Sequence, residues 1–199
     1  MTRTFVSWNV NGIRAAERKG FLDWLAKADY GVVGIQETKV SDHAILNAAL
    51  RHPDGYRSYW HGATSKKGYS GVAVYTKVEP VSVKTTFGSS PLSAEGRVIE
   101  LDFGDWLFLN VYFPNGKASP ERLRYKLAFY DAFLDYLKVK RRAGRSIIFG
   151  GDVNTAHREI DLARPEANVS ISGFLPEERR WIDRLLEAGF IDTFRLFQP

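Results

Sequence analysis

The 199-residue chain contains no cysteine, only four histidines and no hydrophobic run of transmembrane length. Without cysteine there is no disulfide framework, and the composition fits a reducing compartment. A membrane-spanning helix needs about 20 consecutive apolar residues, so the sequence predicts no membrane partner. We therefore expect an intracellular protein.

Marks of a second domain are equally scarce. The sequence has no internal repeat, no low-complexity tract and no Pro/Gly/Ser-rich linker. Its N-terminus enters a strand pattern at residues 4–8 without a basic segment followed by an apolar signal stretch. With 44% apolar residues, the chain is long enough to bury a sizeable core. These features predict a single domain over residues 1–199.

The charge balance is positive. Lys and Arg number 28 and Asp and Glu 23, which gives a formal net charge of +5. A positive surface attracts polyanions without reading any sequence, so an acidic partner is consistent with it. Part of the excess lies near the predicted end of a long helix, at Lys138, Lys140, Arg141 and Arg142. Cations there suit the helix dipole, so we interpret this cluster as a solvated helix end.

Strand-like apolar runs outnumber helical ones. Strands are expected at residues 5–8, 31–35, 56–60, 71–75, 81–85, 98–103, 106–112 and 146–149. A long helix is expected to have Ser119 as its N-cap, Pro120 as its first residue and Gly144 just past its end. Another begins at Pro176 and ends at Gly189. Strands that alternate irregularly with helices predict an α/β sandwich, with two mixed sheets face to face and helices outside.

The segment Gly150-Gly151-Asp152-Val153-Asn154 places a carboxylate and a carboxamide two residues apart, behind the apolar run 146–149. We expect the glycines to let the backbone turn, so that both polar side chains project past the sheet edge. An aspartate can accept a proton from water, and an asparagine can donate amide hydrogens to a phosphate oxygen without adding negative charge. Alone, the segment is more typical of an Asx turn that caps a strand.

Three further polar segments follow predicted strands. They are residues 9–12 (NVNG), 36–39 (QETK) and 110–116 (NVYFPNG). Because scaffolds often present functional side chains where regular elements end, the four segments together predict one oxygen-rich cleft. Mg²⁺ or Mn²⁺ suits such oxygen ligands, whereas the lack of cysteine and the scattered histidines argue against zinc.

The two most informative side chains of these segments also have structural interpretations. Glu37 is the best candidate metal ligand, but an exposed strand-end glutamate paired with Lys39 would give the same pattern. Tyr112 fits a core aromatic with its hydroxyl at the surface. A sharp turn after Phe113 would instead let that hydroxyl reach the cleft.

Eight segments, in order along the whole chain, resemble the exonuclease III family of apurinic/apyrimidinic endonucleases. They are residues 7–15 (SWNVNGIRA), 36–39 (QETK), 68–73 (GYSGVA), 95–97 (EGR), 112–116 (YFPNG), 151–154 (GDVN), 173–179 (GFLPEER) and 192–195 (DTFR). The set is specific as a whole, although Gly-Asp-x-Asn alone is not. The resemblance implies a DNase I-like fold of the endonuclease/exonuclease/phosphatase superfamily, a four-layer α/β sandwich of two mixed β-sheets flanked by helices.

The resemblance also implies an activity. Members of this family are Mg²⁺-dependent DNA-repair nucleases that hydrolyse the phosphodiester 5′ to an abasic site, often with 3′-5′ exonuclease and 3′-phosphodiesterase activities. The implied partner is double-stranded DNA with abasic or 3′-blocked sites, and the implied cofactor is Mg²⁺, with Mn²⁺ as the alternative. In a prokaryote, such a protein is expected in the cytoplasm and on the nucleoid.

Roles transfer to this chain by motif match. Glu37 would bind the metal, with Asn9 beside it. Asp152 would orient or deprotonate the attacking water, while Asn154 and Tyr112 would hold the scissile phosphate. The physical chemistry agrees with these roles, because a metal and neutral donors stabilise charge that develops on phosphorus.

Further residues match positions along the family's DNA-binding face. They are Arg14, Lys39, Tyr69, Arg97, Asn115 and Asn168. Outside the motif context, each would be an ordinary surface residue. His157 follows the Asp152/Asn154 pair closely, but we assign it no role because the corresponding histidine of the family pattern is not the catalytic one.

The family pattern continues past the last matched segment with further strands, an aromatic stretch, an Arg-x-Asp motif and a terminal Ser-Asp-His motif. None of these follows residues 192–195, and the only Ser-Asp-His, at residues 41–43, lies at the start of a predicted helix. We therefore expect that the C-terminal strands are missing, that apolar sheet edges are exposed, and that the 199 residues have weak or no turnover. A separate C-terminal segment that completes the fold is then a candidate partner.

Two other functions fit part of the pattern. A non-catalytic nucleic-acid-binding relative of the same fold would explain the missing C-terminal motifs, but it would have little need for Glu37, Tyr112, Asp152 and Asn154. A phosphatase that acts on inositol phosphates or sphingolipids fits the metal site but not the DNA-facing motifs. The nuclease is therefore the favoured prediction, and the binding relative is the alternative.

Overall fold

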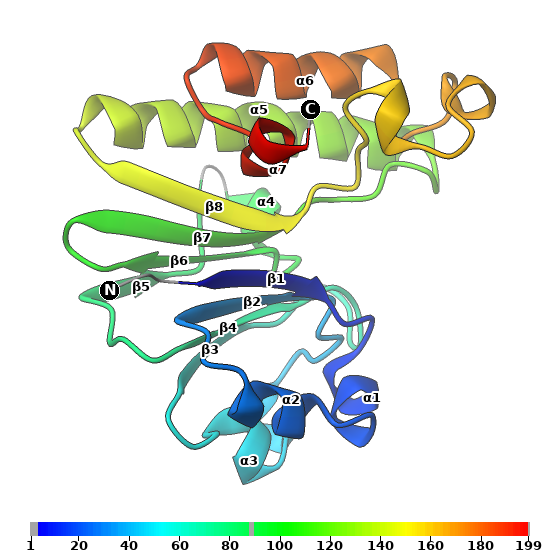
Figure 1. Cartoon of the computed structure of the whole chain (residues 1–199). Coiled ribbons are helices and arrows are strands. Elements are labelled where there is room, and N and C mark those ends of the chain that lie inside the picture. The colour runs from blue at the N-terminus through cyan, green and yellow to red at the C-terminus, as the bar shows by residue number, and fades with distance from the viewer. Residues whose placement is uncertain (1–3, 88–89, 199) are drawn as a thin grey trace. The chain divides into compact units, whose positions relative to one another are not determined.

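The computed structural model describes residues 4–87 and 90–198 and divides into two compact units. Unit 1 comprises residues 1–112 and 140–152, and unit 2 comprises residues 113–139 and 153–199. Unit 1 holds two four-stranded sheets, and unit 2 holds helices and loops (Figure 1). The expectation of a single domain over residues 1–199 stays a prediction.

The first sheet of unit 1 has the strand order β1-β2-β4-β3. Its strands are β1 (Phe5–Asn9), β2 (Val32–Gln36), β3 (Arg57–His61) and β4 (Val72–Thr76). β1 runs parallel to β2, whereas β4 runs antiparallel to both β2 and β3. Every residue of β2 and β4 is buried, as expected for central strands covered on both faces.

The second sheet of unit 1 has the strand order β5-β6-β7-β8. Its strands are β5 (Ser82–Lys84), β6 (Val98–Asp102), β7 (Trp106–Tyr112) and β8 (Ser146–Asp152). The β5/β6 and β6/β7 pairs are antiparallel, and β7 and β8 are parallel. Both sheets are therefore mixed. The predicted class, α/β with two mixed sheets flanked by helices, is confirmed.

Two apolar clusters follow from the alternation of side chains along the strands. One lies between the sheets and joins Val32 and Val74 of the first sheet to Ile99 and Phe108 of the second. The other covers the opposite face of the first sheet, where Val33 packs with residues of the neighbouring helices. The helical elements of unit 1 are α1 (Ile13–Arg18), α2 (Phe21–Lys27), η1 (His43–Ile45), α3 (Ala48–Arg51) and α4 (Ser90–Ser93), of which α1, α2 and α3 lie on this outer side (Figure 1).

A buried polar contact sets the alignment of the two sheets. Asn110 of β7 is fully buried, and its amide nitrogen donates to the carbonyl oxygens of Ile35 and Ala73 in the first sheet, at 2.9 Å each. Its carbonyl oxygen accepts a hydrogen bond of 2.6 Å from Nε2 of Gln36. A Cβ atom on Gly34 would lie 2.9 Å from Cγ of Asn110, so only glycine leaves room for this side chain.

Unit 2 contains α5 (Pro120–Arg142) up to Val139, together with η2 (Glu159–Asp161), η3 (Glu166–Asn168), α6 (Pro176–Glu187) and α7 (Thr193–Phe197). α5 begins as expected, because Oγ of Ser119 accepts a hydrogen bond of 3.3 Å from the Arg122 backbone N–H. Its aromatic face meets Phe113, whose ring centroid lies 5.2 Å from that of Phe133. Trp181 of α6 lies 5.4 Å from the same Phe113 ring.

The turn expected at Gly150 and Gly151 is a wrong prediction. β8 continues through both glycines to Asp152, with Gly150 paired to Asn110 and Gly151 to Val111 of β7. A Cβ atom on Gly151 would lie only 1.8 Å from the Val111 carbonyl oxygen, and its φ is +146°. Glycine is needed here because two backbones approach closely, and not because the chain reverses.

Candidate active site

Four of the predicted site residues lie together in unit 1. Asn9 ends β1, Glu37 directly follows β2, Tyr112 ends β7 and Asp152 ends β8. β1 is parallel to β2 and β7 is parallel to β8, so the ends of each pair reach the same edge of their sheet. The alignment of the sheets then brings the two edges together.

One amide group joins the two acidic side chains. Nδ2 of Asn9 donates to Oε1 of Glu37 at 3.0 Å and to Oδ2 of Asp152 at 2.8 Å. Oδ1 of Asn9 accepts a hydrogen bond of 3.0 Å from the Asn11 backbone N–H, which fixes the orientation of the amide. A neutral donor thus holds two carboxylates near one another without neutralising either.

The Tyr112 hydroxyl is the second donor to Glu37. Its oxygen lies 2.6 Å from Oε1 of Glu37. Burial and the neighbouring Glu37 carboxylate raise the pKa of the Tyr112 phenol well above its usual value. Tyr112 therefore keeps its proton at neutral pH and acts as a donor.

Glu37 is ionised and reachable from solvent. Burial of the side chain raises its pKa, but hydrogen bonds from Asn9 and Tyr112 and the nearby Lys39 ammonium outweigh burial and hold the pKa below the ordinary value. The side chain is 22% exposed, and Nζ of Lys39 lies 3.5 Å from Oε2. The backbone of Glu37 is left-handed, with a φ of +53°. The chain bends there as it leaves β2.

The donor set fits a hard divalent cation. Carboxylate oxygens of Glu37 and Asp152 flank the Asn9 amide, and Mg²⁺ binds through one or two carboxylates plus water and phosphate oxygens. Within residues 4–87 and 90–198, no group of three or more His, Cys, Asp or Glu residues could form a metal cage. In this arrangement Asn9 turns its nitrogen to the acids, so it orients them, and its role as a ligand stays a prediction.

Arg97, predicted on the DNA-binding face, is only 1% exposed. Its guanidinium carbon lies 4.8 Å from the centroid of the Tyr112 ring, and it donates to the Tyr112 carbonyl oxygen at 3.0 Å and to the Tyr69 hydroxyl at 2.9 Å. Nε also donates to Glu95 at 2.8 Å. Arg97 thus contacts two aromatic residues, Tyr69 and Tyr112, from a buried position, and its contact with DNA stays a prediction.

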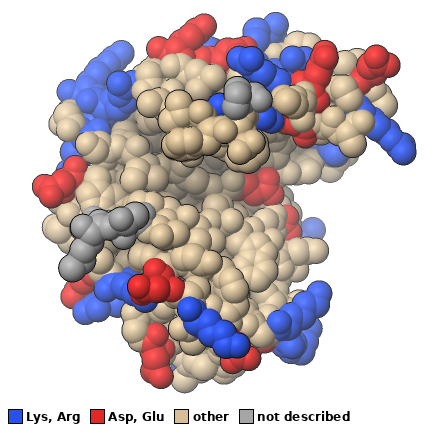
Figure 2. Space-filling view, viewed as in Figure 1, with Lys and Arg blue, Asp and Glu red and all other residues tan. Residues whose placement is uncertain are grey.

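The other predicted DNA-binding residues of unit 1 are accessible to different degrees. Arg14 on α1 and Lys39 after β2 are exposed, and Tyr69 is half-buried. On the face that Figure 2 shows, positively and negatively charged side chains are interspersed. Its charge pattern alone therefore marks no track for a polyanion on this face.

Unit 2 brings Asn154 and Asn115 together. Oδ1 of Asn154 accepts a hydrogen bond of 3.3 Å from Nδ2 of Asn115, and its own Nδ2 donates to the Phe113 carbonyl oxygen at 2.9 Å. Asn154 has a left-handed backbone, with a φ of +55°. Asn168 in η3 donates to the Arg164 carbonyl oxygen at 2.7 Å and so stabilises its own loop.

His157 makes its contacts within unit 2. Its Nε2 lies 2.7 Å from Oδ1 of Asp183, and its backbone N–H donates to Oδ2 of Asp161 at 3.1 Å. These contacts give the histidine a structural role.

Sequence reasoning missed one pair of charged residues. Lys126 of α5 and Glu178 of α6 are both fully buried, with Nζ and Oε1 2.6 Å apart. A signal was available, since Lys126 lies three residues after Leu123 and four before Tyr130, inside the apolar stripe of the helix. A lysine at such a position needs a partner.

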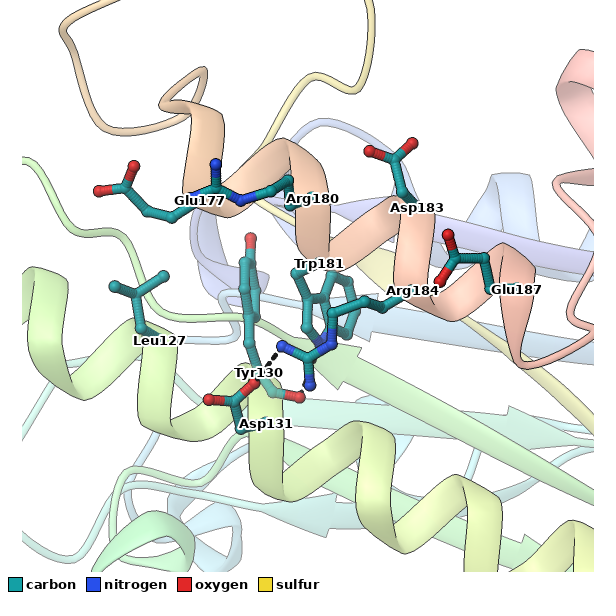
Figure 3. A pocket seen from close by; sticks show the side chains of 9 residues that line it. All are labelled: Leu127, Tyr130, Asp131, Glu177, Arg180, Trp181, Asp183, Arg184 and Glu187. Carbon is teal, nitrogen blue, oxygen red and sulfur yellow. Dashed lines mark hydrogen bonds and ion pairs between the residues drawn. The ribbon is translucent and has the colours of Figure 1, made fainter.

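A groove of about 400 Å³ runs between α5 and α6 (Figure 3). Apolar and charged side chains line it together, among them Tyr130, Trp181 and the ion pair of Asp131 with Arg184, whose atoms lie 2.8 Å apart. None of the predicted site residues lines this groove. Across the described part of the chain, no helix combines the length and apolar character needed to cross a membrane.

Comparison with known proteins gives concordant matches. Residues 6–195 match the model of the Endonuclease/Exonuclease/phosphatase family. The chain is 42% identical to an exodeoxyribonuclease of Bacillus subtilis, over 98% of this chain and 75% of that protein. It is 40% identical to the DNA repair nuclease APEX1 of Danio rerio, over 97% of this chain and 62% of that protein. The 199 residues thus span less than two thirds of the Danio rerio relative.

A solved structure gives the same picture. The structure of an AP endonuclease from Archaeoglobus fulgidus superimposes with a TM-score of 0.85 at 30% sequence identity. The match covers 98% of this chain and 73% of the other. The resemblance read from the eight sequence segments is confirmed.

Proposed function

Because the chain belongs to the Endonuclease/Exonuclease/phosphatase family, we propose that it hydrolyses the phosphodiester 5′ to abasic sites in double-stranded DNA, with Mg²⁺ as cofactor. Relatives named exodeoxyribonuclease, DNA repair nuclease and AP endonuclease support this reaction class. The observation that carries the proposal is the single Asn9 amide that donates to both Glu37 and Asp152. Two carboxyl groups held by one neutral amide can serve different steps of one hydrolysis.

Glu37 and Asp152 have different roles at the reacting phosphate, metal binding for Glu37 and activation of water for Asp152. Glu37, whose pKa is depressed, offers a permanent carboxylate that would hold Mg²⁺. Asp152 orients the attacking water and accepts its proton. Bound Mg²⁺ would supply positive charge to the phosphate oxygens and make a nearby water easier to deprotonate. Asn9 keeps both acids in position throughout.

Tyr112 and Asn154 act as neutral donors to the scissile phosphate, and Tyr112 would turn its single hydroxyl hydrogen from Glu37 to a phosphate oxygen for this role. Because the pKa of the Tyr112 phenol is raised, the hydroxyl stays protonated and can donate a hydrogen bond. Neutral donors stabilise charge that develops on phosphorus without repelling the nucleophile. The DNA itself would lie along the exposed Arg14, Lys39 and Asn115, with Tyr69, Arg97 and Asn168 contributing where they become accessible. Removal of 3′-blocking groups and 3′-5′ exonuclease activity would use the same acids.

The test is cleavage of a duplex that carries one tetrahydrofuran abasic analogue. It is run with the 199-residue chain and with a version extended through any downstream reading frame, and a lesion-free duplex serves as control. We expect the extended version to make a single cut 5′ to the analogue that EDTA abolishes and added Mg²⁺ restores, and the 199-residue chain to cut weakly or not at all. Binding without cleavage by the extended protein would favour the non-catalytic relative. Hydrolysis of inositol phosphates without DNA binding would overturn both nucleic-acid functions.

A further inference from the structure

The buried ion pair of unit 2 has every polar atom occupied. Nζ of Lys126 donates to Oε1 of Glu178 at 2.6 Å, to the Asn154 carbonyl oxygen at 2.7 Å and to Oγ1 of Thr155 at 2.9 Å. An ammonium has three hydrogens, so these three contacts use all of them. Both side chains are fully shielded from water.

Glu178 is satisfied equally well. Its Oε1 also accepts from Oγ of Ser172 at 2.7 Å, and its Oε2 accepts from the backbone N–H groups of Gly173 at 2.6 Å and Leu175 at 3.0 Å. One carboxylate therefore fixes the loop that leads into α6.

Such a pair is a weak source of stability. Removing two charges from water costs as much as their attraction returns, and apolar replacement of both partners is often neutral or stabilising. The hydrogen bonds of the pair instead hold the backbone and side-chain groups that they contact in one arrangement. Here those groups belong to two loops, residues 153–155 and 172–175.

Two further hydrogen bonds hold these loops. The backbone N–H of Ala156, directly after the first loop, donates to the carbonyl oxygen of Gly173 in the second loop at 2.9 Å. The hydroxyl of Tyr130 in α5 donates to the carbonyl oxygen of Val153 in the first loop at 2.9 Å. Neither bond involves the ion pair. The Ala156 contact therefore reports independently on whether the loops are held in place.

Asn154, a residue of the proposed site, lies in the first of these loops. Its left-handed φ of +55° is uncommon outside glycine, and the Lys126 contact fixes the peptide that carries it. That peptide sets the position from which the Asn154 carboxamide reaches the Phe113 carbonyl oxygen and Nδ2 of Asn115. We propose that the Lys126–Glu178 pair is a positioning device that holds Asn154 in the orientation needed for the scissile phosphate. This proposal rests on the proposed function, in which Asn154 is a phosphate donor.

The first experiment measures the loops without any substrate. In Lys126→Met/Glu178→Leu, the Ala156 amide should exchange with solvent at least about tenfold faster than in the parent chain. The matched control is Asp131→Asn/Arg184→Gln, which removes an exposed ion pair between the same two helices (Figure 3) and should leave Ala156 unchanged. Unchanged Ala156 exchange in the Met/Leu variant overturns the proposal. If that variant does not fold, Glu178→Gln takes its place with the same two outcomes.

The second experiment asks whether the effect passes through Asn154. The Met/Leu variant should lower kcat on the abasic duplex about 10- to 100-fold with little change in KM, because the donor is misplaced and DNA binding is kept. In an Asn154→Ala background, the same change should cost no further kcat. Equal losses in both backgrounds would mean that the pair acts elsewhere. If neither the 199-residue chain nor its extended version cuts the abasic duplex, the proposed function fails, and Ala156 exchange alone decides whether the pair holds the loops.

Discussion

The two units stabilise a glutamate in opposite ways. Glu37 of unit 1 accepts hydrogen bonds from the neutral Asn9 and Tyr112 and keeps 22% of its side chain exposed. Glu178 of unit 2 is closed off from water, and its charge is neutralised by Lys126. Neutral donors leave the carboxylate charge available to attract a cation, whereas a buried ammonium neutralises it. The first arrangement suits chemistry, and the second suits the fixing of loops.

The largest expected effect separates chemistry from folding in unit 1. Asp152→Asn should lower kcat on an abasic duplex about 10²- to 10⁴-fold, because the proton acceptor is gone. The variant should keep its melting temperature and bind DNA almost as well, since the new side-chain oxygen can still accept from Asn9. Single-turnover kinetics and thermal unfolding measure the two quantities. Unchanged cleavage would remove Asp152 from the mechanism, and a large drop in melting temperature would break the comparison between the units.

The next effect tests unit 2. Glu178→Leu alone should reduce the free energy of unfolding by about 3–5 kcal/mol, because Lys126 is left buried without its counter-ion. Adding Lys126→Met should recover most of the loss. Urea unfolding of the single and double variants gives both numbers. A Glu178→Leu protein as stable as the parent would show that Lys126 finds another partner.

A third variant tests the packing of β8, the strand that ends at Asp152, without a change of charge. Gly151→Ala should cost about 3 kcal/mol, because the new methyl group would overlap the Val111 carbonyl oxygen. Gly150→Ala is the control in the same strand, since its nearest contact there is Cβ of Ser7 at 3.8 Å. Denaturant unfolding of both variants measures the difference. Equal losses would show that the close approach at Gly151 is not what glycine is needed for.

The smallest effect concerns Asp161 of unit 2, a partly buried carboxylate that is paired with Arg195 but remains near solvent. Partial burial raises its pKa, but hydrogen bonds from the Arg158 backbone and the Arg195 guanidinium outweigh burial and lower the pKa below its ordinary 3.8. Because the folded-state pKa is depressed, the stabilisation is present above about pH 4 and is lost as pH falls through the folded value. Asp161→Asn should cost about 0.5 kcal/mol at pH 7, since the pair is near solvent. Its unfolding free energy should vary less between about pH 2.5 and 4.5 than that of the parent.

The sequence allowed prediction of which residues of the candidate site lie at strand ends. Asn9, Tyr112 and Asp152 end apolar strands and Glu37 follows one, so both the alternation of hydrophobic residues and the family motifs marked them. The two mixed sheets were predictable for the same reason. Element bounds moved by only one or two residues for most strands.

What the sequence could not show depends on contacts between distant segments. Gly151 was expected in a turn because local rules treat paired glycines as turn residues, while its actual constraint is the Val111 backbone. Arg97 was expected at the surface, since nothing local reveals that two tyrosines cover it. The place of Lys126 in the apolar stripe of α5 indicates burial, but its partner could not be named, because Glu178 lies 52 residues away on another helix.

Asn110 gives the site a mechanical property. Gln36, its partner in the first sheet, immediately precedes Glu37, and Tyr112 lies two residues after Asn110 on the same face of β7. A slide of one sheet over the other would therefore strain the Asn110 contact and the Tyr112–Glu37 contact at the same time. The spacing between Glu37 and Asp152 thus depends on Asn110, a side chain buried between the two sheets and out of reach of solvent.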